Sequence, residues 1–242
     1  MAAKLQIDPL AADLLTESAI QKMRQRTRIL QMMDTVERVA ISPIRTRRLH
    51  GFAYLADVLS PVWNLPAFDG IVLKIAGGPH YPDFQRELDQ LVILGLVEIS
   101  DIRYSPQPDG GARIDAAYSL NLAAPTLTSI LEALGARDNS LALDPMDYEV
   151  YNFLLDLAGA LATVPDEEID KAASVDATYA DDRVGQTNVI DFGRWTTDAH
   201  LDNLSVRTVD RFQHFLPSEA SLSSGEKLYL YASFLGRRVH GQ

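Results

Sequence analysis

Residues 82–95 read PDFQRELDQLVILG, and this stretch decides the fold. Pro82 opens the run, apolar residues recur at helical spacing, and Gly95 ends it, which predicts a helix. Leu96 to Ile99 continue as a strand toward a turn rich in proline and glycine at 105–111. Residues 113–120 return antiparallel. The pattern therefore predicts a helix followed by a β-hairpin.

Two further apolar runs precede this unit. The first has helical spacing across residues 49–59, until Pro61 stops it. The second opens at Pro66 and is closed by Gly77-Gly78, so we expect a short second helix there. Three helices followed by a hairpin predict a winged helix-turn-helix domain with a small β wing, which we place at residues 44–125.

The solvent face of the expected third helix carries more acid than base, and DNA phosphates would repel it. Its polar residues are Asp83, Gln85, Arg86, Glu87, Asp89 and Gln90. We therefore predict that this face binds a protein partner through Asp83, Arg86, Glu87 and Asp89. A winged-helix transcriptional regulator that binds DNA is the alternative, and the arginines of the N-terminal segment mildly support it.

The N-terminal segment, residues 1–43, predicts one long amphipathic helix from about Pro9 to Ala40. Ile20, Met23, Thr27 and Leu30 form a narrow apolar seam along it, which favours packing against a partner helix. We expect Ile20, Met23 and Leu30 to contact a partner. Nine cations oppose five carboxylates through residue 48, so this part carries +4 and the remainder −15.

That basic charge has two interpretations. It is compatible with contacts to nucleic acid or to an acidic partner, and it is equally the charge that keeps an ordinary helix solvated. The first interpretation assigns contacts with nucleic acid or an acidic partner to Arg24, Arg28, Arg45, Arg47 and Arg48. Any DNA contact is expected to be indirect or independent of sequence, because the charge is modest for a nucleic-acid binder.

The rest of the chain predicts a linker at 126–143 and a helical C-terminal domain at 144–242. Asp144-Pro145 starts an almost wholly apolar helix through about Leu161, which should be buried. Ser223 and Glu226 have the spacing of a capping box for the last helix. Residues 176–195 show no period and predict an irregular connection. The expected fold class is thus mainly α.

Composition excludes several kinds of site. The 242-residue chain has no cysteine, so disulfides, thiolate nucleophiles and cysteine-bound metals are excluded. No histidine pair has zinc-ligand spacing, and we expect neither a cofactor nor a metal. No apolar run approaches the roughly 20 residues of a membrane span, so we expect a cytoplasmic protein without membrane contact.

Three short strings resemble known motifs by their letters. LSSGEK at 222–227 is similar to the signature of ABC-type ATPases, but no P-loop accompanies it, and the capping box explains it better. DFG at 191–193 lacks the other kinase motifs. Asp176, Asp181 and Asp182 lack the ladder of a calcium loop and are expected to be surface carboxylates. We therefore predict a protein that is not an enzyme.

Several longer strings together resemble a bacterial defence family. They are LHGFAYLADVLSPVW at 49–63, GGPHYP at 77–82 with Gln85 to Leu91, DATY at 176–179, NVIDF at 188–192 and EKLYLY at 226–231. The family is the middle or accessory component of ABC-three-component, Lamassu-type anti-phage systems. The resemblance implies a non-catalytic scaffold subunit that joins an SMC-like ATPase to a toxic effector, commonly a nuclease. It supplies no residue roles.

Overall fold

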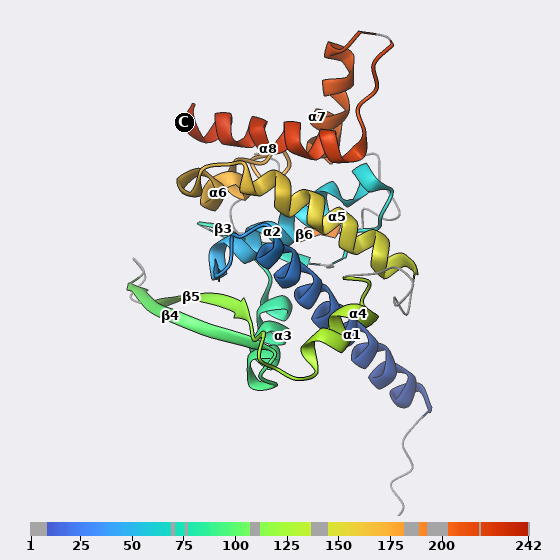
Figure 1. Ribbon diagram of the computed structural model, residues 1–242, viewed down its shortest axis with the longest axis vertical. Helices are drawn as coiled ribbons and strands as arrows, with labels where there is room; N and C mark the ends of the chain where they lie inside the picture. The colour runs from blue at the N-terminus through green and yellow to red at the C-terminus, as the bar shows by residue number, and fades with distance from the viewer. Residues whose placement is uncertain are drawn as a thin grey trace, which may run out of the picture.

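The computed structural model describes residues 9–68, 71–75, 77–106, 112–136, 145–181, 189–192, 203–217 and 219–241. Within them the chain is mainly helical, with two small antiparallel sheets. In Figure 1 the last two helices, drawn in orange and red, lie in the upper part of the molecule, and the helix Pro82–Ile93 with the strands Val97–Pro106 and Ala112–Leu120, drawn in green, lies in the lower part beside the blue N-terminal helix. No helix of these ranges combines the length and the apolar character that a bilayer-spanning segment requires.

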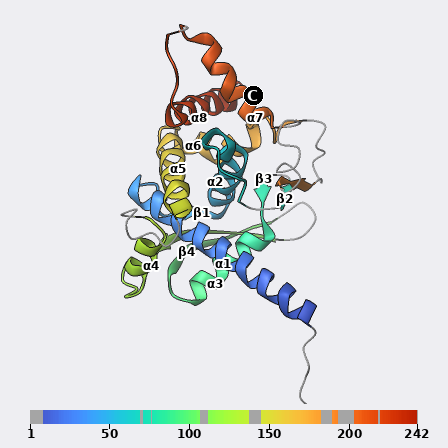
Figure 2. The same cartoon turned by 90° about the vertical axis from the view of Figure 1, so that its right-hand side faces the viewer.

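Helix α1 (Pro9–Arg38) is a single long helix, as the periodicity predicts. Its C-terminal half lies in the core, where Ile29, Met32, Met33 and Val36 are fully buried. This half packs against α5 and α3. In contrast, its N-terminal half extends beyond the body of the protein (Figure 2). The two halves of one helix therefore have different environments.

Helix α2 (Thr46–Leu59) is the central element of the fold. Every residue from Leu49 to Leu59 is buried, because α5, α6, α7 and the strands β3 and β5 surround this helix. A helix that is apolar on nearly all sides must be enclosed in this way. The 3-10 turn η1 (Ser60–Trp63) follows and ends at Asn64, whose φ of 56° lies in the left-handed region.

The prediction of a second helix between Pro66 and Gly77 is wrong. Residues 71–75 form strand β2 (Ile71–Ile75), which turns through Gly77 into β3 (Gly78–His80) and pairs on its other side with β6 (Val189–Asp191). The φ angles of Gly77 and Gly78, 103° and 125°, allow the tight turn. A winged helix-turn-helix domain would need a helix here, so the fold shares only part of that plan.

The remainder of that plan is present. Helix α3 (Pro82–Ile93) leads into β4 (Val97–Pro106) and β5 (Ala112–Leu120), as predicted, and β5 also pairs with β1 (Ile44–Arg45). The sheet order is β1-β5-β4, and β4 is its outer strand. Helix α4 (Leu127–Ala133) connects this sheet to the C-terminal helices.

The C-terminal helices are α5 (Pro145–Ala162), α6 (Asp166–Ala172) with the 3-10 turn η2 (Ala173–Val175), α7 (Leu204–Phe212) with η4 (Gln213–Phe215), and α8 (Ser224–His240). The predicted capping box is confirmed: the Ser223 hydroxyl accepts from the Glu226 amide and the Glu226 carboxylate accepts from the Ser223 amide. Buried apolar residues of α1, α2, α3, α5, α7 and α8 form one continuous core.

Candidate docking groove

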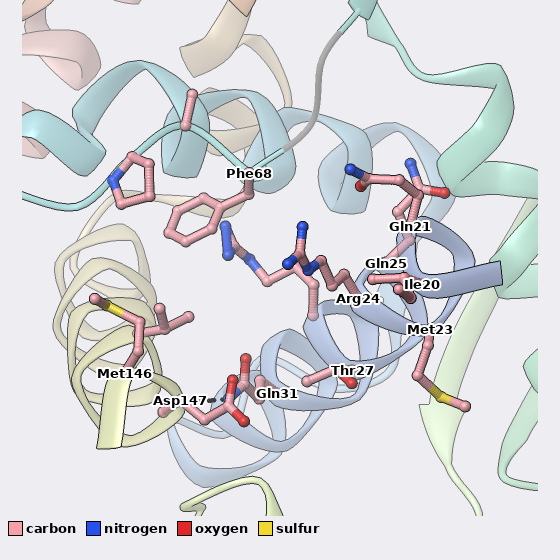
Figure 3. Close-up of a pocket in the computed structure, with 14 residues that line it drawn as sticks. Ile20, Gln21, Met23, Arg24, Gln25, Thr27, Gln31, Phe68, Met146 and Asp147 are labelled. Carbon is pink, nitrogen blue, oxygen red and sulfur yellow. Dashed lines mark hydrogen bonds between the residues drawn. The ribbon is translucent and has the colours of Figure 1, made fainter. Parts of the chain in front are cut away.

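An open groove of about 680 Å³ lies between the middle of α1, the loop 66–68 and the start of α5. It brings together four of the predicted contact residues, namely Ile20, Met23, Arg24 and Arg28. The loop contributes Pro66, Ala67 and Phe68, and α5 contributes Met146, Asp147 and Val150. Figure 3 shows Arg24 and Phe68 pointing into the groove, with Met146 on the opposite wall.

The loop wall is held in place by a buried carboxylate. Asp57 of α2 is 1% exposed and accepts hydrogen bonds from the Phe68 amide at 2.8 Å and the Tyr81 hydroxyl at 2.8 Å. The Phe68 ring stacks on Phe153 of α5 and carries the Arg28 guanidinium over its face. Contacts within the chain therefore position this wall of the groove.

The floor of the groove joins three helices. The Gln31 amide donates to the carbonyl oxygens of Leu134 at 2.9 Å and Asp147 at 3.1 Å, which ties α1 to the end of α4 and the start of α5. One turn of helix later, the buried Asp34 carboxylate accepts from the Tyr151 hydroxyl at 2.6 Å. These contacts fix the direction in which α1 leaves the body.

The predicted seam on α1 has an exposed part and a buried part, which meet at the floor of the groove. Ile20 is 41% exposed and Met23 is 64% exposed, so both remain available to a partner. Leu30 is only 4% exposed and Arg28 only 6% exposed, and both belong to the interior of the fold. The expected contact between Leu30 and a partner is therefore wrong, because Leu30 lies in the core. Arg28, predicted to contact nucleic acid or an acidic partner, lines the groove with its guanidinium over the Phe68 ring.

The predicted acidic face of α3 divides in a similar way. Asp83, Arg86 and Asp89 are exposed, and Arg86 forms an ion pair with Asp83 at 3.0 Å. Glu87 is 2% exposed and pairs with Arg26 of α1 at 2.7 Å. The expected contact between Glu87 and a partner is thus wrong, because this carboxylate stabilises the packing of α3 on α1 instead.

Two of the three predicted arginines that follow α1 form ion pairs within the chain. Arg48 pairs with Asp170 at 2.8 Å and Asp166 at 3.0 Å, both on α6. Arg45 pairs with Asp101 and with Asp115, and the hydrogen bond that Arg45 donates to the Asp101 carboxylate raises the pKa of Arg45. Arg47 is half-buried. Of the five arginines predicted for nucleic acid or an acidic partner, only Arg24 is exposed, so they do not form one basic surface.

A second feature was missed from the sequence. Asp176, expected to be a surface carboxylate, is fully buried between α2, α7 and α8. Its oxygens accept from the hydroxyls of Tyr54 at 2.7 Å, Tyr231 at 2.5 Å and Ser205 at 2.7 Å. The amides of Thr178 and Tyr179 also donate to it. Burial first, and then the Asp176 charge, raise the pKa of both tyrosines.

The other candidate motifs have structural explanations where they are described. The Lys74 ammonium donates a hydrogen bond to the backbone carbonyl oxygen of Asp181 at 3.2 Å. Asp182 lies outside the described residues. Phe192 of the DFG string is fully buried and its ring lies 6.1 Å from the ring of Tyr54, whereas Gly193 is not described. In the described ranges, no group of three histidine or acidic side chains is placed to hold a metal ion.

No protein-family model, no curated protein and no solved structure matches this chain. The resemblance to the anti-phage family therefore stays a prediction.

Proposed function

We propose that this chain is a non-catalytic adaptor subunit that docks onto a partner protein through the groove beside α1. The resemblance to accessory components of Lamassu-type systems suggests which partners these are: an SMC-like ATPase and an effector, commonly a nuclease. In such a complex the adaptor joins the two, and its binding surfaces replace an active site as the functional parts of the molecule.

One observation carries this proposal, namely the exposure of apolar side chains around a preformed groove. Met23 is 64% exposed, Met146 is 46% exposed and Ile20 is 41% exposed, although all three border the same groove. Exposed apolar side chains that cluster at a concave surface mark interaction sites, whereas single ones do not. Methionine suits such a surface because its flexible thioether adapts to different partners.

The exposed part of α3 gives the adaptor a second candidate surface. Asp83, Arg86 and Asp89 are solvent-exposed on α3, which packs against α1. Charges of this kind steer association and determine partner choice more than they contribute to affinity. We therefore assign the affinity to the groove and the specificity of orientation to α3.

Co-purification of the full chain with the proteins encoded beside it tests the proposal. The double variant Ile20→Asp/Met23→Asp should lose the partners, because it replaces two of the exposed apolar side chains at the groove with carboxylates. Its circular dichroism and melting temperature should stay native, because both positions are exposed. Phe215→Asp is the matched control: Phe215 is 84% exposed, lies on η4 far from the groove, and its replacement should leave the complex intact.

Two results would overturn the proposal. One is retention of all partners by the folded double variant, which would exclude the groove. The other is tight binding of the isolated chain to a defined DNA operator at physiological salt, which would favour the transcriptional regulator. The acidic face of α3 and the internal ion pairs of Arg45 and Arg48 argue against that second outcome.

A further inference from the structure

Strand β4 leaves one edge of its sheet open. It is the outer strand of the order β1-β5-β4, and in the part of the chain that the structure describes no strand pairs with its other side. Figure 1 shows the hairpin β4–β5 extending from the body. An open edge of this length is a template for pairing with another strand.

The exposed side chains of this hairpin are unusually apolar for an open edge. Tyr104 is 71% exposed, Ile114 56%, Ile102 50% and Ile99 40%. Natural proteins usually protect edge strands with lysine, proline or inward-pointing charges to prevent uncontrolled pairing. Strand β4 has such charges at Glu98, Asp101 and Arg103 and also a β-bulge, but its isoleucine and tyrosine side chains stay exposed between them. These residue types favour strand pairing.

A β-bulge places these side chains on one face. Ser100 is opposite Ala117 and Arg103 is opposite Asp115, so two residues of β4, Asp101 and Ile102, share the position opposite Ala116. Asp101 has a φ of 46°, which is the left-handed conformation of such a bulge. The extra residue shifts the alternation by one. Ile99, Ile102 and Tyr104 consequently lie on the same face as Ile114.

We propose that β4 pairs antiparallel with β4 of a second copy of this chain. One register is self-complementary: Glu98 lies opposite Arg103 of the other copy, Ile99 opposite Ile102, and Val97 opposite Tyr104. The two-fold axis repeats every pair, which is the requirement for a closed dimer. The bulge is essential here, because without it Ile99 and Ile102 would lie on opposite faces.

The charges select this register over its neighbours. Glu98 is exposed, and the Arg103 side chain is 63% exposed, although it is also hydrogen-bonded to Asp101 of its own chain at 2.7 and 3.0 Å. A shift by two residues places Glu98 opposite either Asp101 or Ser105, which is repulsive in the first case and loses the ion pair in the second. This inference is independent of the proposed adaptor function.

Mass measurement of the full chain gives the first test. Light scattering after gel filtration should show a mass that rises with concentration toward twice the 26.7 kDa of one chain. Glu98→Arg should remain monomeric, because it faces Arg103 with like charge, and Glu98→Arg/Arg103→Glu should recover the dimer. Glu219→Arg, an exposed glutamate away from the hairpin, is the matched control and should dimerise normally. A native chain that stays monomeric at all concentrations, or a double variant as monomeric as Glu98→Arg, overturns the proposal.

Cysteine cross-linking tests the register directly, since the native chain has no cysteine. Directly opposite residues have Cβ atoms about 4.5–5.5 Å apart, close enough for a disulfide after slight adjustment. A mixture of Ile99→Cys and Ile102→Cys chains should therefore form an oxidised dimer. Ile99→Cys alone should not, because its two copies are three residues apart, about 10 Å along the strands. Equal cross-linking of both samples would overturn the register. Pairing of β4 with an added partner protein, and not with a second copy of the chain, would overturn the proposal itself.

Discussion

Replacement of Asp176 by alanine should lower the free energy of unfolding by about 3–5 kcal/mol, because it removes the common acceptor of several buried hydrogen-bond donors. The carboxylate has no solvent exposure and accepts hydrogen bonds from Tyr54, Tyr231 and Ser205 and from two backbone amides. Alanine leaves these donors enclosed without their acceptor. Three contacts remain: the Ser205 hydroxyl lies 2.8 Å from the Thr178 hydroxyl, the Thr178 amide donates to the Ser205 hydroxyl at 3.3 Å, and the Tyr231 hydroxyl accepts from the Ala177 amide at 3.4 Å.

The magnitude follows from the donors that are left behind. A hydrogen bond to a charged group contributes about 1.5–3 kcal/mol, so Tyr54 and Tyr231 alone account for about 3–6 kcal/mol. Relief from burying the charge of Asp176 opposes this loss. The more conservative Asp176→Asn keeps one acceptor oxygen and the shape of the side chain, and should cost about 1–2 kcal/mol. Natural domains have only about 5–15 kcal/mol in total, so the alanine variant should be visibly less stable.

Urea unfolding followed by circular dichroism measures these differences. The decisive comparison is Asp176→Ala in the background of Tyr54→Phe/Tyr231→Phe, where the two strongest donors are already absent. The alanine replacement should then cost much less than in the native chain, because fewer donors lose their acceptor. An alanine variant within about 1 kcal/mol of native, or an equal cost in both backgrounds, would refute the reasoning.

Three other predictions concern local features. Burial raises the pKa values of Tyr54 and Tyr231 above the ordinary 10.0, so these two hydroxyls ionise at a lower pH in the unfolded chain than in the folded one. Their contribution to the free energy of unfolding should therefore be complete below pH 10 and be lost as the pH rises above it, and tyrosinate absorbance should show that both ionise only when the chain unfolds. Gly135→Ala should cost at least about 2 kcal/mol in urea unfolding, because its φ is 75° and the new Cβ would lie 2.9 Å from a backbone atom of Tyr148, whereas Gly95→Ala, with a φ of 71° and open space around it, should cost only about 1 kcal/mol. Ser223→Ala should lower stability by about 1 kcal/mol through loss of the α8 cap, seen as a lower urea midpoint with an unchanged slope.

Periodicity alone predicted most of the helices. The apolar spacing in α1, α2, α3, α5 and α8 repeats over several turns, and the turn residues between β4 and β5 mark their hairpin. Strand β2 was missed because its alternation is inverted. Lys74 is buried, where it donates to Asp181 and lies beside the Tyr179 ring, while Ile71 and Ile75 are exposed. A short apolar run between proline and glycine then fits a helix equally well.

The sites show a clearer limit of sequence reasoning. The spacing of Ile20, Met23 and Leu30 correctly places them on α1, but spacing cannot tell which turn of a helix another element covers. Likewise, Asp176 has partners 122, 29 and 55 residues away along the chain, and no local pattern connects them. Burial of a carboxylate by distant tyrosines is a property of the tertiary fold.

The continuity of α1 has a mechanical consequence. Its 30 residues span about 45 Å as one rigid rod, at about 1.5 Å per residue. The buried half is clamped by Gln31, Asp34 and the apolar residues around them. The projecting half therefore continues into the packed half without a break in the helix. A molecule bound at the projecting end cannot rotate it without straining the contacts of α1 with α3 and α5, so a force applied there is transmitted to the core.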